Sequence, residues 1–435
     1  MTISGFPSRT PIAACALIAM VLLMQPSVQA LDVVLDITSG EAKPIDIALP
    51  FFTCAQPGNE SIIEEIHRIF VQDLEYSNRF TVVDISRFFP TGTTEMTNPN
   101  FKEWYLAGIA ALITGHINMG GDEIEVNMRL FDVPMGNQII GVRYKTPYAK
   151  LRTVIHKFAD EVQFRLTGER GISFSQISFV SNKSGHQEIY VVDPDGGLLQ
   201  EITANGTTNL SPAWAPGGGK IYYTSYAGGR PDLYVYDLES SKSSPLVKGG
   251  MNITPAISAD GQFLTWSMSF DGDPEIVVAP VSGKSPKRLT STPGVDCNPS
   301  FSPGGNELVF TSDRSGDPQL YIMDIEGGNL RRLTVTGDYN TAADWSPRGD
   351  WIVYHSRREG VFNLWLVHPD GSDDHQVTAD AGHNEDPCFA RDGRHFTFIS
   401  SRNGGKGLYI SDLSGQKVRP VLIMHGICAN PSWSR

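Results

Sequence analysis

The sequence predicts an all-β six-bladed β-propeller that follows a smaller N-terminal α/β domain. Two observations predict the propeller. A turn glycine recurs with a period of 43 or 44 residues, and the first and last repeats are complementary fragments of one unit. A fixed period of this length marks a repeat architecture, and four-stranded propeller blades have this size.

Each repeat is defined by its turn glycine and by the strand before it. The turn glycines are Gly218, Gly261, Gly305, Gly349 and Gly393. A large apolar residue stands four positions earlier in each repeat, and Trp433 occupies that position in a sixth copy. Two runs rich in β-branched and aromatic residues follow, such as "ELVFTS" and "QLYIMD", with a glycine-bearing turn between them. A short last run closes the unit, so each repeat predicts four strands.

The two ends of the repeat region predict how the ring closes. The first unit, from Gln176, lacks its opening strand, and residues 430–434 supply only that strand. Pairing the two fragments completes a sixth blade and leaves no open sheet edge. A superhelical β-solenoid also fits the period, but it does not explain the complementary ends. We therefore predict a propeller over residues 171–435 that the C-terminal strand closes.

The first residues predict export. Arg9 is followed by an apolar run over residues 12–24, which is too short to span a bilayer, and "VQA" ends at Ala30. We interpret residues 1–30 as a signal peptide, so the mature chain begins at Leu31 without stable membrane insertion. The net charge of −13 disfavours nucleic acid and anionic membranes as partners.

Residues 31–170 predict the α/β domain. The expected elements are strands over 44–52 and 80–84, a helix over 61–76, a short helix leading into a strand over 111–117, a hairpin, and a closing helix over 151–166. A hinge over 167–174 leads to the propeller. Four cysteines follow the signal peptide: Cys54, Cys297, Cys388 and Cys428. Their spacing fits no disulfide framework or metal motif, and we expect at most one disulfide.

Three motifs carry a resemblance to a known family. They are "WYLAGIAALITGHI" at 104–117, "LRTVIHKFADEVQFRLTGERGIS" at 151–173 and the blade opening P-x-W-S-P-x-G. With the order signal peptide, α/β domain and propeller, the mature chain resembles the TolB family, the periplasmic components of the Tol–Pal system of Gram-negative envelopes. The sequence departs from the repeat pattern at Ala343, which replaces a blade-opening proline, and at "AISADG" in the second repeat.

The resemblance implies a periplasmic binding protein rather than an enzyme, without a cofactor or metal. In the family the propeller binds the lipoprotein Pal over its central channel, and the mature N-terminus binds the C-terminal domain of TolA. The assembly supports outer-membrane integrity and cell division, and some colicins exploit it. By this resemblance we expect a monomer with Pal and TolA as partners.

The candidate Pal-binding residues are loop positions that differ from blade to blade, because varied loops on a repeated scaffold usually carry the function. They are Met251, Thr254, Cys297, Asn298, Thr341 and Glu385. The candidate TolA-binding segment alternates polar and apolar residues, so it could add as a strand to a partner sheet. It consists of Leu31, Asp32, Val33, Val34, Leu35, Asp36 and Ile37. An edge strand of the α/β domain itself is an equally good interpretation of this segment.

One short polar side chain recurs three positions before each blade-opening residue. The set is Asn209, Asn252, Asp296, Asn340 and Asn384, with Cys428 in the last blade. Such side chains cap turns, and they could alternatively face a partner. We favour capping for these residues.

An enzyme is the alternative function. The nucleophile motif G-x-S-x-G and the phosphate-binding loops are absent from the sequence. A lyase or hydrolase inside the channel, acting on an envelope polysaccharide or peptide, would use inward groups such as His355. "DPDGG" at 193–197 lacks the ligand count of a calcium loop, and His156 with Asp160 lacks a third ligand. We interpret the first as a tight turn and the second as a solvated or hinge-facing pair.

Overall fold

The computed structural model describes residues 43–85, 98–269, 272–379 and 381–434. The predicted signal peptide and the predicted TolA-binding segment, residues 31–37, lie outside these ranges. Within the described ranges the chain forms an α/β domain followed by a six-bladed propeller, as the sequence predicts.

Over its described residues, 43–85 and 98–167, the α/β domain contains three helices and one sheet. Its elements are β1 (Ile45–Ala48), β2 (Thr53–Cys54), α1 (Glu60–Tyr76), β3 (Phe80–Val82), α2 (Phe101–Leu106), β4 (Ala111–Gly120), β5 (Glu123–Asp132), β6 (Asn137–Pro147), the 3-10 turn η2 (Tyr148–Lys150) and α3 (Leu151–Thr167). The strand order is β3-β1-β4-β5-β6, with β2 paired to β4. The first three strands of this order are parallel, and the β4–β5–β6 part is antiparallel.

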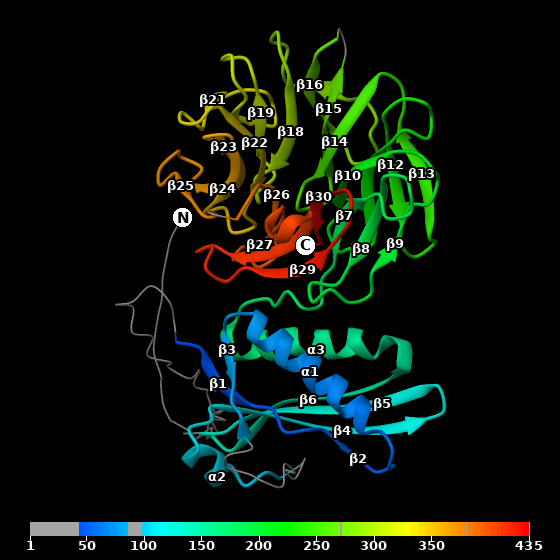
Figure 1. The fold of residues 1–435 in the computed structure, drawn as a ribbon, viewed down its shortest axis with the longest axis vertical. Coiled ribbons are helices and arrows are strands. Elements are labelled where there is room, and N and C mark those ends of the chain that lie inside the picture. Colours follow the sequence, from blue (N-terminus) through cyan, green and yellow to red (C-terminus); the bar gives the residue numbers. More distant parts are fainter. Residues whose placement is uncertain (1–42, 86–97, 270–271, 380, 435) are drawn as a thin grey trace, which may run out of the picture. The chain divides into compact units, whose positions relative to one another are not determined.

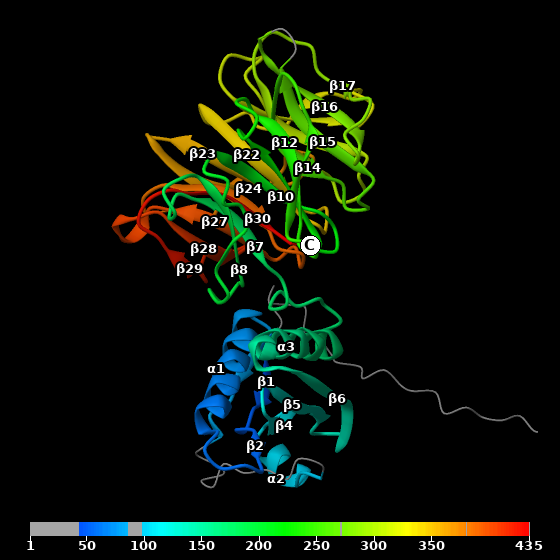
Figure 2. The same cartoon turned by 90° about the vertical axis from the view of Figure 1, so that its right-hand side faces the viewer.

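Alternation along the strands gives this sheet two apolar faces. Ile113 of β4 packs in the cluster that α1 and α3 cover, whereas its neighbour Leu112 packs with Trp104 of α2 on the other face. Figure 2 shows α1 and α3 on one side of the sheet. Helix α3 ends at Gly168, whose φ of 73° provides the left-handed residue that terminates many helices.

Six four-stranded sheets form the propeller (Figure 1). The inner strands are β10 (Asn209–Trp214), β14 (Met251–Ile257), β18 (Asp296–Phe301), β22 (Tyr339–Trp345), β26 (Asn384–Phe389) and β30 (Cys428–Trp433). The second strands are β7 (Ile177–Ser181), β11 (Lys220–Ser225), β15 (Phe263–Ser269), β19 (Glu307–Ser312), β23 (Ile352–Arg358) and β27 (His395–Ser400).

The third and fourth strands complete each blade. The third strands are β8 (Glu188–Val192), β12 (Asp232–Asp237), β16 (Pro274–Pro280), β20 (Gln319–Asp324), β24 (Val361–Val367) and β28 (Gly407–Asp412). The fourth strands are β9 (Gln200–Glu201), β13 (Lys242–Val247), β17 (Lys287–Arg288), β21 (Arg331–Arg332), β25 (His375–Gln376) and β29 (Arg419–Ile423); the 3-10 turn η3 (Arg402–Gly404) precedes β28. All neighbours within a blade are antiparallel, so a meander of short connections builds each sheet.

The seam blade confirms the predicted closure. Strand β30 pairs with β7, with Cys428 opposite Ser181 and Trp433 opposite Ile177. The indole Nε1 of Trp433 donates a hydrogen bond to Ser175 Oγ at 2.7 Å, and the side chain is 1% exposed. The ring is therefore closed by residues from the two ends of the propeller sequence.

Candidate functional site

The propeller has two rims, which the direction of the inner strands distinguishes. We call the end at which the inner strands begin the start rim; it includes Asn209, Met251, Asp296, Tyr339, Asn384 and Cys428. We call the opposite end the hinge rim; it includes the turns over 193–197, 216–219, 346–350 and 390–394. Since all blades run the same way, each rim carries the same type of connection six times.

All six inner strands share one irregularity near the start rim. In each inner strand, the residue two positions after Asn209 or its equivalent has a left-handed backbone conformation, and the pairing register shifts beside it. The six residues and their φ angles are Ser211 (48°), Thr254 (53°), Asn298 (54°), Ala342 (51°), Asp386 (51°) and Asn430 (46°). A bulge of this kind re-aims side chains, and bulges are frequent beside functional sites. The start rim therefore has a six-fold ring of half-buried side chains at the channel.

Thr254 and Asn298 of the predicted Pal-binding residues belong to this ring, and the other four lie on the same inner strands; their predicted loop positions are wrong. Met251 is the first residue of β14, and the other five lie within β14, β18, β22 and β26. These residues lie in strands because the strand pairing continues on both sides of the bulge. In β18, for example, Cys297 pairs with Thr311 just before the bulge. The structure thus brings the six residues onto four neighbouring inner strands.

Hydrogen bonds and ion pairs hold several of these side chains. Thr254 is hydrogen-bonded to Ser267 at 2.8 Å, and Lys406 Nζ lies 3.1 Å from Glu385 Oε2. Thr341 is hydrogen-bonded to Thr311 of the preceding blade at 2.9 Å. Burial raises the pKa of the Cys297 thiol to about 12, so this side chain is a neutral, small apolar group.

The recurrent Asx residues have the capping role that the sequence favours. Asn252 is fully buried; its amide donates to Gly249 O at 2.8 Å and its carbonyl accepts from Trp266 Nε1 at 3.0 Å. Asp296, also buried, pairs with Arg314 at 2.9 Å. These groups are saturated within the blade, so they are not available to a partner.

One sector of the channel is acidic. Asp344, Glu385 and Asp386 lie at half-buried positions of the adjacent inner strands β22 and β26. His355 faces Asp386 from β23, and its Nδ1 accepts the Asp386 N–H at 3.0 Å. Burial lowers the pKa of His355, so the ring is neutral. The residue that a channel enzyme would use thus has one nitrogen engaged with the backbone.

The hinge rim is occupied by contacts with the chain's own α/β domain. Glu169, in the hinge, accepts hydrogen bonds from Arg394 of the β26–β27 turn and from Arg79 beside β3, both at 2.5 Å. Partial burial alone would raise the pKa of Glu169, but the two guanidinium groups outweigh it and lower the pKa. Arg348 of the neighbouring blade lies 3.8 Å from the same carboxylate.

A second contact joins Asp160 of α3 to Arg391. The Asp160 carboxylate also accepts the backbone N–H groups of Ser173 at 2.9 Å and Phe174 at 3.1 Å, and Arg391 Nε donates to Gly171 O at 2.6 Å. Burial raises the pKa of Asp160 to about 6, against the opposing effect of Arg391. Asp160 thus faces the hinge, whereas the solvated alternative is wrong.

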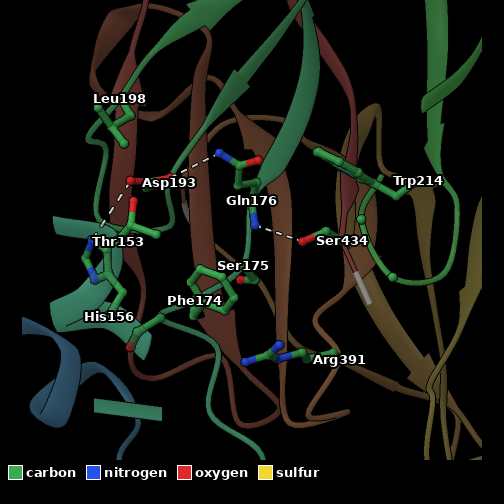
Figure 3. Close-up of a pocket in the computed structure, with 13 residues that line it drawn as sticks. Thr153, His156, Phe174, Ser175, Gln176, Asp193, Leu198, Trp214, Arg391 and Ser434 are labelled. Carbon is green, nitrogen blue, oxygen red and sulfur yellow. Dashed lines mark hydrogen bonds and ion pairs between the residues drawn. The ribbon is translucent and has the colours of Figure 1, made fainter. Parts of the chain in front are cut away.

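His156, one turn earlier on α3, is 2% exposed and is also not solvated. Its Nδ1 lies 2.7 Å from Asp73 Oδ2, and its Nε2 lies 3.9 Å from Asp193 Oδ2 and 4.0 Å from Asp195 Oδ2. Figure 3 shows His156 and Asp193, which help to line a pocket of about 370 Å³. Sequence reasoning singled out His156 and the "DPDGG" aspartates separately but missed the cluster, because its members come from separate elements.

The cysteines and helices complete the description. Cys54, Cys297, Cys388 and Cys428 form no disulfide with one another. Among the described residues, none of the helices combines the length and the apolar character needed to cross a bilayer.

Together, these elements define a two-domain protein in which an α/β domain precedes a closed six-bladed propeller. Family models agree. A model described as the TolB beta propeller domain matches residues 164–435, and one described as the TolB amino-terminal domain matches residues 33–139. The chain belongs to the TolB family.

Relatives and a solved structure extend this match. The chain is 37% identical over 258 residues to the Tol-Pal system protein TolB of Desulfosudis oleivorans, an alignment that covers 58% of each chain. It is 34% identical over 290 residues to a TolB homolog of Chlorobium chlorochromatii, covering 65% of this chain and 64% of the relative. The chain thus spans less than two thirds of the length of these relatives. The crystal structure of TolB from Acinetobacter baumannii superposes with a TM-score of 0.76 at 25% identity, covering 90% of this chain and 97% of that one.

Proposed function

We propose that this chain is a periplasmic binding scaffold of a Tol-Pal system, not an enzyme. Its start rim binds the lipoprotein Pal over the channel, and residues 31–37 bind the C-terminal domain of TolA. Linking these partners supports outer-membrane integrity and cell division. Membership of the TolB family and the names of relatives as Tol-Pal system proteins support this proposal.

The observation that supports it most is the contrast between the rims. The hinge rim is engaged by Glu169, Asp160 and α3 of the same chain, so a partner that covers the channel has the start rim as its surface. There, six bulged strands present half-buried side chains of varied chemistry around a common axis. The acidic sector of β22 and β26 suits a partner that contributes basic or hydrogen-bond-donating groups.

The test compares substitutions on the two rims. Thr254→Arg and Glu385→Arg should each weaken Pal binding by about 1–3 kcal/mol, because bulk or reversed charge enters the centre of the interface. Gln262→Arg is the matched control, since Gln262 is exposed in a hinge-rim turn. Titration calorimetry with purified Pal measures the affinities, and thermal melts verify folding. If only Gln262→Arg weakened binding, Pal would bind the hinge rim and the proposed site would be wrong.

A separate deletion tests the TolA segment. Removing residues 31–37 should abolish binding of the TolA C-terminal domain and leave Pal binding and the melting temperature unchanged, because an extended terminus can add as a strand to a partner sheet. If the deletion instead removes cooperative unfolding, the segment is an edge strand of the α/β domain.

A further inference from the structure

We propose that His156, Asp193 and Asp195 form a binding site for a divalent transition metal of the zinc class at the hinge rim. His156 belongs to α3, and the two aspartates belong to the turn between β8 and β9. One donor atom from each residue can be chosen so that all three lie within 4.8 Å of one another. A metal here would join the closing helix of the α/β domain to the seam blade, which is a role beyond the proposed partner binding.

The orientation of His156 is the first argument. Its Nδ1 lies 2.7 Å from Asp73 Oδ2, and both side chains are at most 5% exposed. An ionised carboxylate can only accept a hydrogen bond, so Nδ1 carries a proton, and in the neutral ring Nε2 keeps the lone pair that a metal needs. A carboxylate behind the imidazole is the arrangement by which proteins orient a metal-binding histidine and raise its basicity.

The environment of Nε2 is the second and independent argument. This atom is buried and has no hydrogen-bond partner within the part of the chain that the structure describes. It faces Asp193 Oδ2 at 3.9 Å and Asp195 Oδ2 at 4.0 Å, which is too far for a hydrogen bond. Buried polar atoms without a partner are rare in proteins and call for an explanation such as an ion. A metal between these three atoms would satisfy all of them.

The two carboxylates are oriented in the same manner as the histidine. Gln176 Nε2 donates to Asp193 Oδ1 at 3.4 Å, and the backbone N–H of Gly197 donates to Asp195 Oδ1 at 3.0 Å. In each aspartate one oxygen is thus held by a neighbour and the other faces Nε2; Figure 3 shows this for Asp193. Zinc bonds to nitrogen and oxygen of about 2.0–2.2 Å separate tetrahedral ligands by roughly 3.3–3.6 Å. The two separations from Nε2, 3.9 and 4.0 Å, need to close by only a few tenths of an ångström.

The adjoining pocket supplies access. Its volume of about 370 Å³ admits hydrated ions, and His156, Asp193, Thr153 and Ser173 are among its lining residues. Three protein ligands beside such a space leave a fourth position for water, as in open zinc sites. Imidazole with carboxylates also suits other divalent transition metals, and zinc is the probe we choose.

Two arginines moderate the affinity. Arg152 Nη2 contacts Asp195 Oδ2, the oxygen that faces Nε2. Arg419 stacks on Tyr76, with its guanidinium carbon 3.7 Å from the centre of the ring. The carboxylates of Asp73, Asp193 and Asp195 outnumber these two guanidinium groups, so the site remains favourable for a cation. Arg152 competes directly with the metal for one ligand. Replacing it should therefore tighten metal binding, which no purely structural role of the cluster predicts.

The experiment titrates zinc into the untagged chain without residues 1–30, after removal of metals with a chelator. Calorimetry should show one saturable site per chain. His156→Gln or Asp193→Asn should weaken binding at least tenfold, and Asp73→Asn by about 10–100-fold through its effect on His156. Arg152→Gln should strengthen binding severalfold. His395→Gln is the matched control: this buried hinge-rim histidine is bonded to Asp392 and Asn78, outside the site, and its loss should leave zinc affinity unchanged.

A measurement on the unaltered protein keeps the test valid if a variant fails to fold. Crystals grown with zinc should give an anomalous-scattering peak between His156 Nε2 and the two aspartates. The proposal is overturned if the unaltered chain lacks a saturable site, if the ligand variants bind zinc as well as the parent does, or if the peak lies elsewhere.

Discussion

The start rim and the hinge rim are built from the same repeat but use polar side chains in different ways. At the hinge rim, Glu169 and Asp160 pair with arginines of the blades, so charges are neutralised within the chain. At the start rim, the Asx residues are buried and hydrogen-bonded within their own blade or to the preceding one, whereas the ring beside them stays half-buried and varied. The difference teaches that one repeated scaffold can present an anchoring face and a binding face, because the two faces use different positions of the repeat.

The strongest test of the comparison weakens the closure of the ring at the seam, on which both rims depend. Trp433→Ala should cost about 3–5 kcal/mol of unfolding free energy, because it leaves a cavity at the seam and removes the bond to Ser175. Both rims should be lost in one transition, measured by urea unfolding with Pal binding as a second readout.

The control for the seam is Trp351→Ala. Trp351 is half-buried and stacks on His368 at 3.8 Å, away from the seam. This change should cost clearly less than Trp433→Ala. Equal losses for the two variants would contradict the special role of closure.

The next effect is a pH dependence that should differ in sign between the rims. Burial raises the pKa of Asp160 to about 6 at the hinge rim, so the folded chain holds this proton more tightly than the unfolded chain. The stabilisation is complete below pH 3.8 and is lost as the pH rises through 6; its size is on the order of 3 kcal/mol. Thermal melts of the parent and of Asp160→Asn between pH 4 and 7 measure this. As the pH rises through about 6, the melting temperature of the parent should fall relative to that of Asp160→Asn, and above this window the two should run parallel.

His355 should show the opposite response at the channel. Burial lowers its pKa, while Asp386 and Glu385 oppose and Lys406 assists this shift. The contribution of His355 is therefore present above pH 6.5 and is lost as the pH falls. Relative to His355→Gln, the parent should lose stability on acidification, and a gain there would break the proposed contrast.

A smaller difference should separate one glutamate on each rim. Glu169→Gln should cost about 1–2 kcal/mol, since two arginines lose a charged acceptor in a partly buried site. Glu385→Gln should cost less than about 1 kcal/mol, because its partner Lys406 is half exposed. Chemical denaturation of both variants measures the contrast, and the reverse order would show that the start rim also anchors.

The smallest expected effect concerns the bulge ring. Thr254 is β-branched and left-handed, a combination that costs about 1 kcal/mol or more, whereas Asn298 at the equivalent position tolerates this backbone. Thr254→Asn should raise the unfolding free energy by up to about 1 kcal/mol, and Asn298→Thr should lower it by a similar amount. Thermal melts of the two exchanges check this; no change in either would mean that the strand relieves the strain.

The sequence predicts the blade number and the closure well, because both follow from a period that recurs along the chain. Of the six left-handed ring residues it singles out only Thr254 and Asn298, and it predicts the geometry of neither. Thr254 has a left-handed backbone in the bulge, whereas the proline that follows it favours an extended backbone. The His156 cluster could not be predicted, because Asp73, His156 and Asp193 meet only after two domains have folded and docked.

The seam also sets an order of events during synthesis. Ser175 and Trp433 are 258 residues apart, and contacts of such separation form late. At about 5–20 residues per second, the ribosome needs roughly 10–50 s to pass from one to the other. Strand β7, whose residues are all buried in the finished ring, has no inner neighbour during this interval. The newly made chain thus carries an unprotected strand edge on β7 until Cys428–Trp433 has been made.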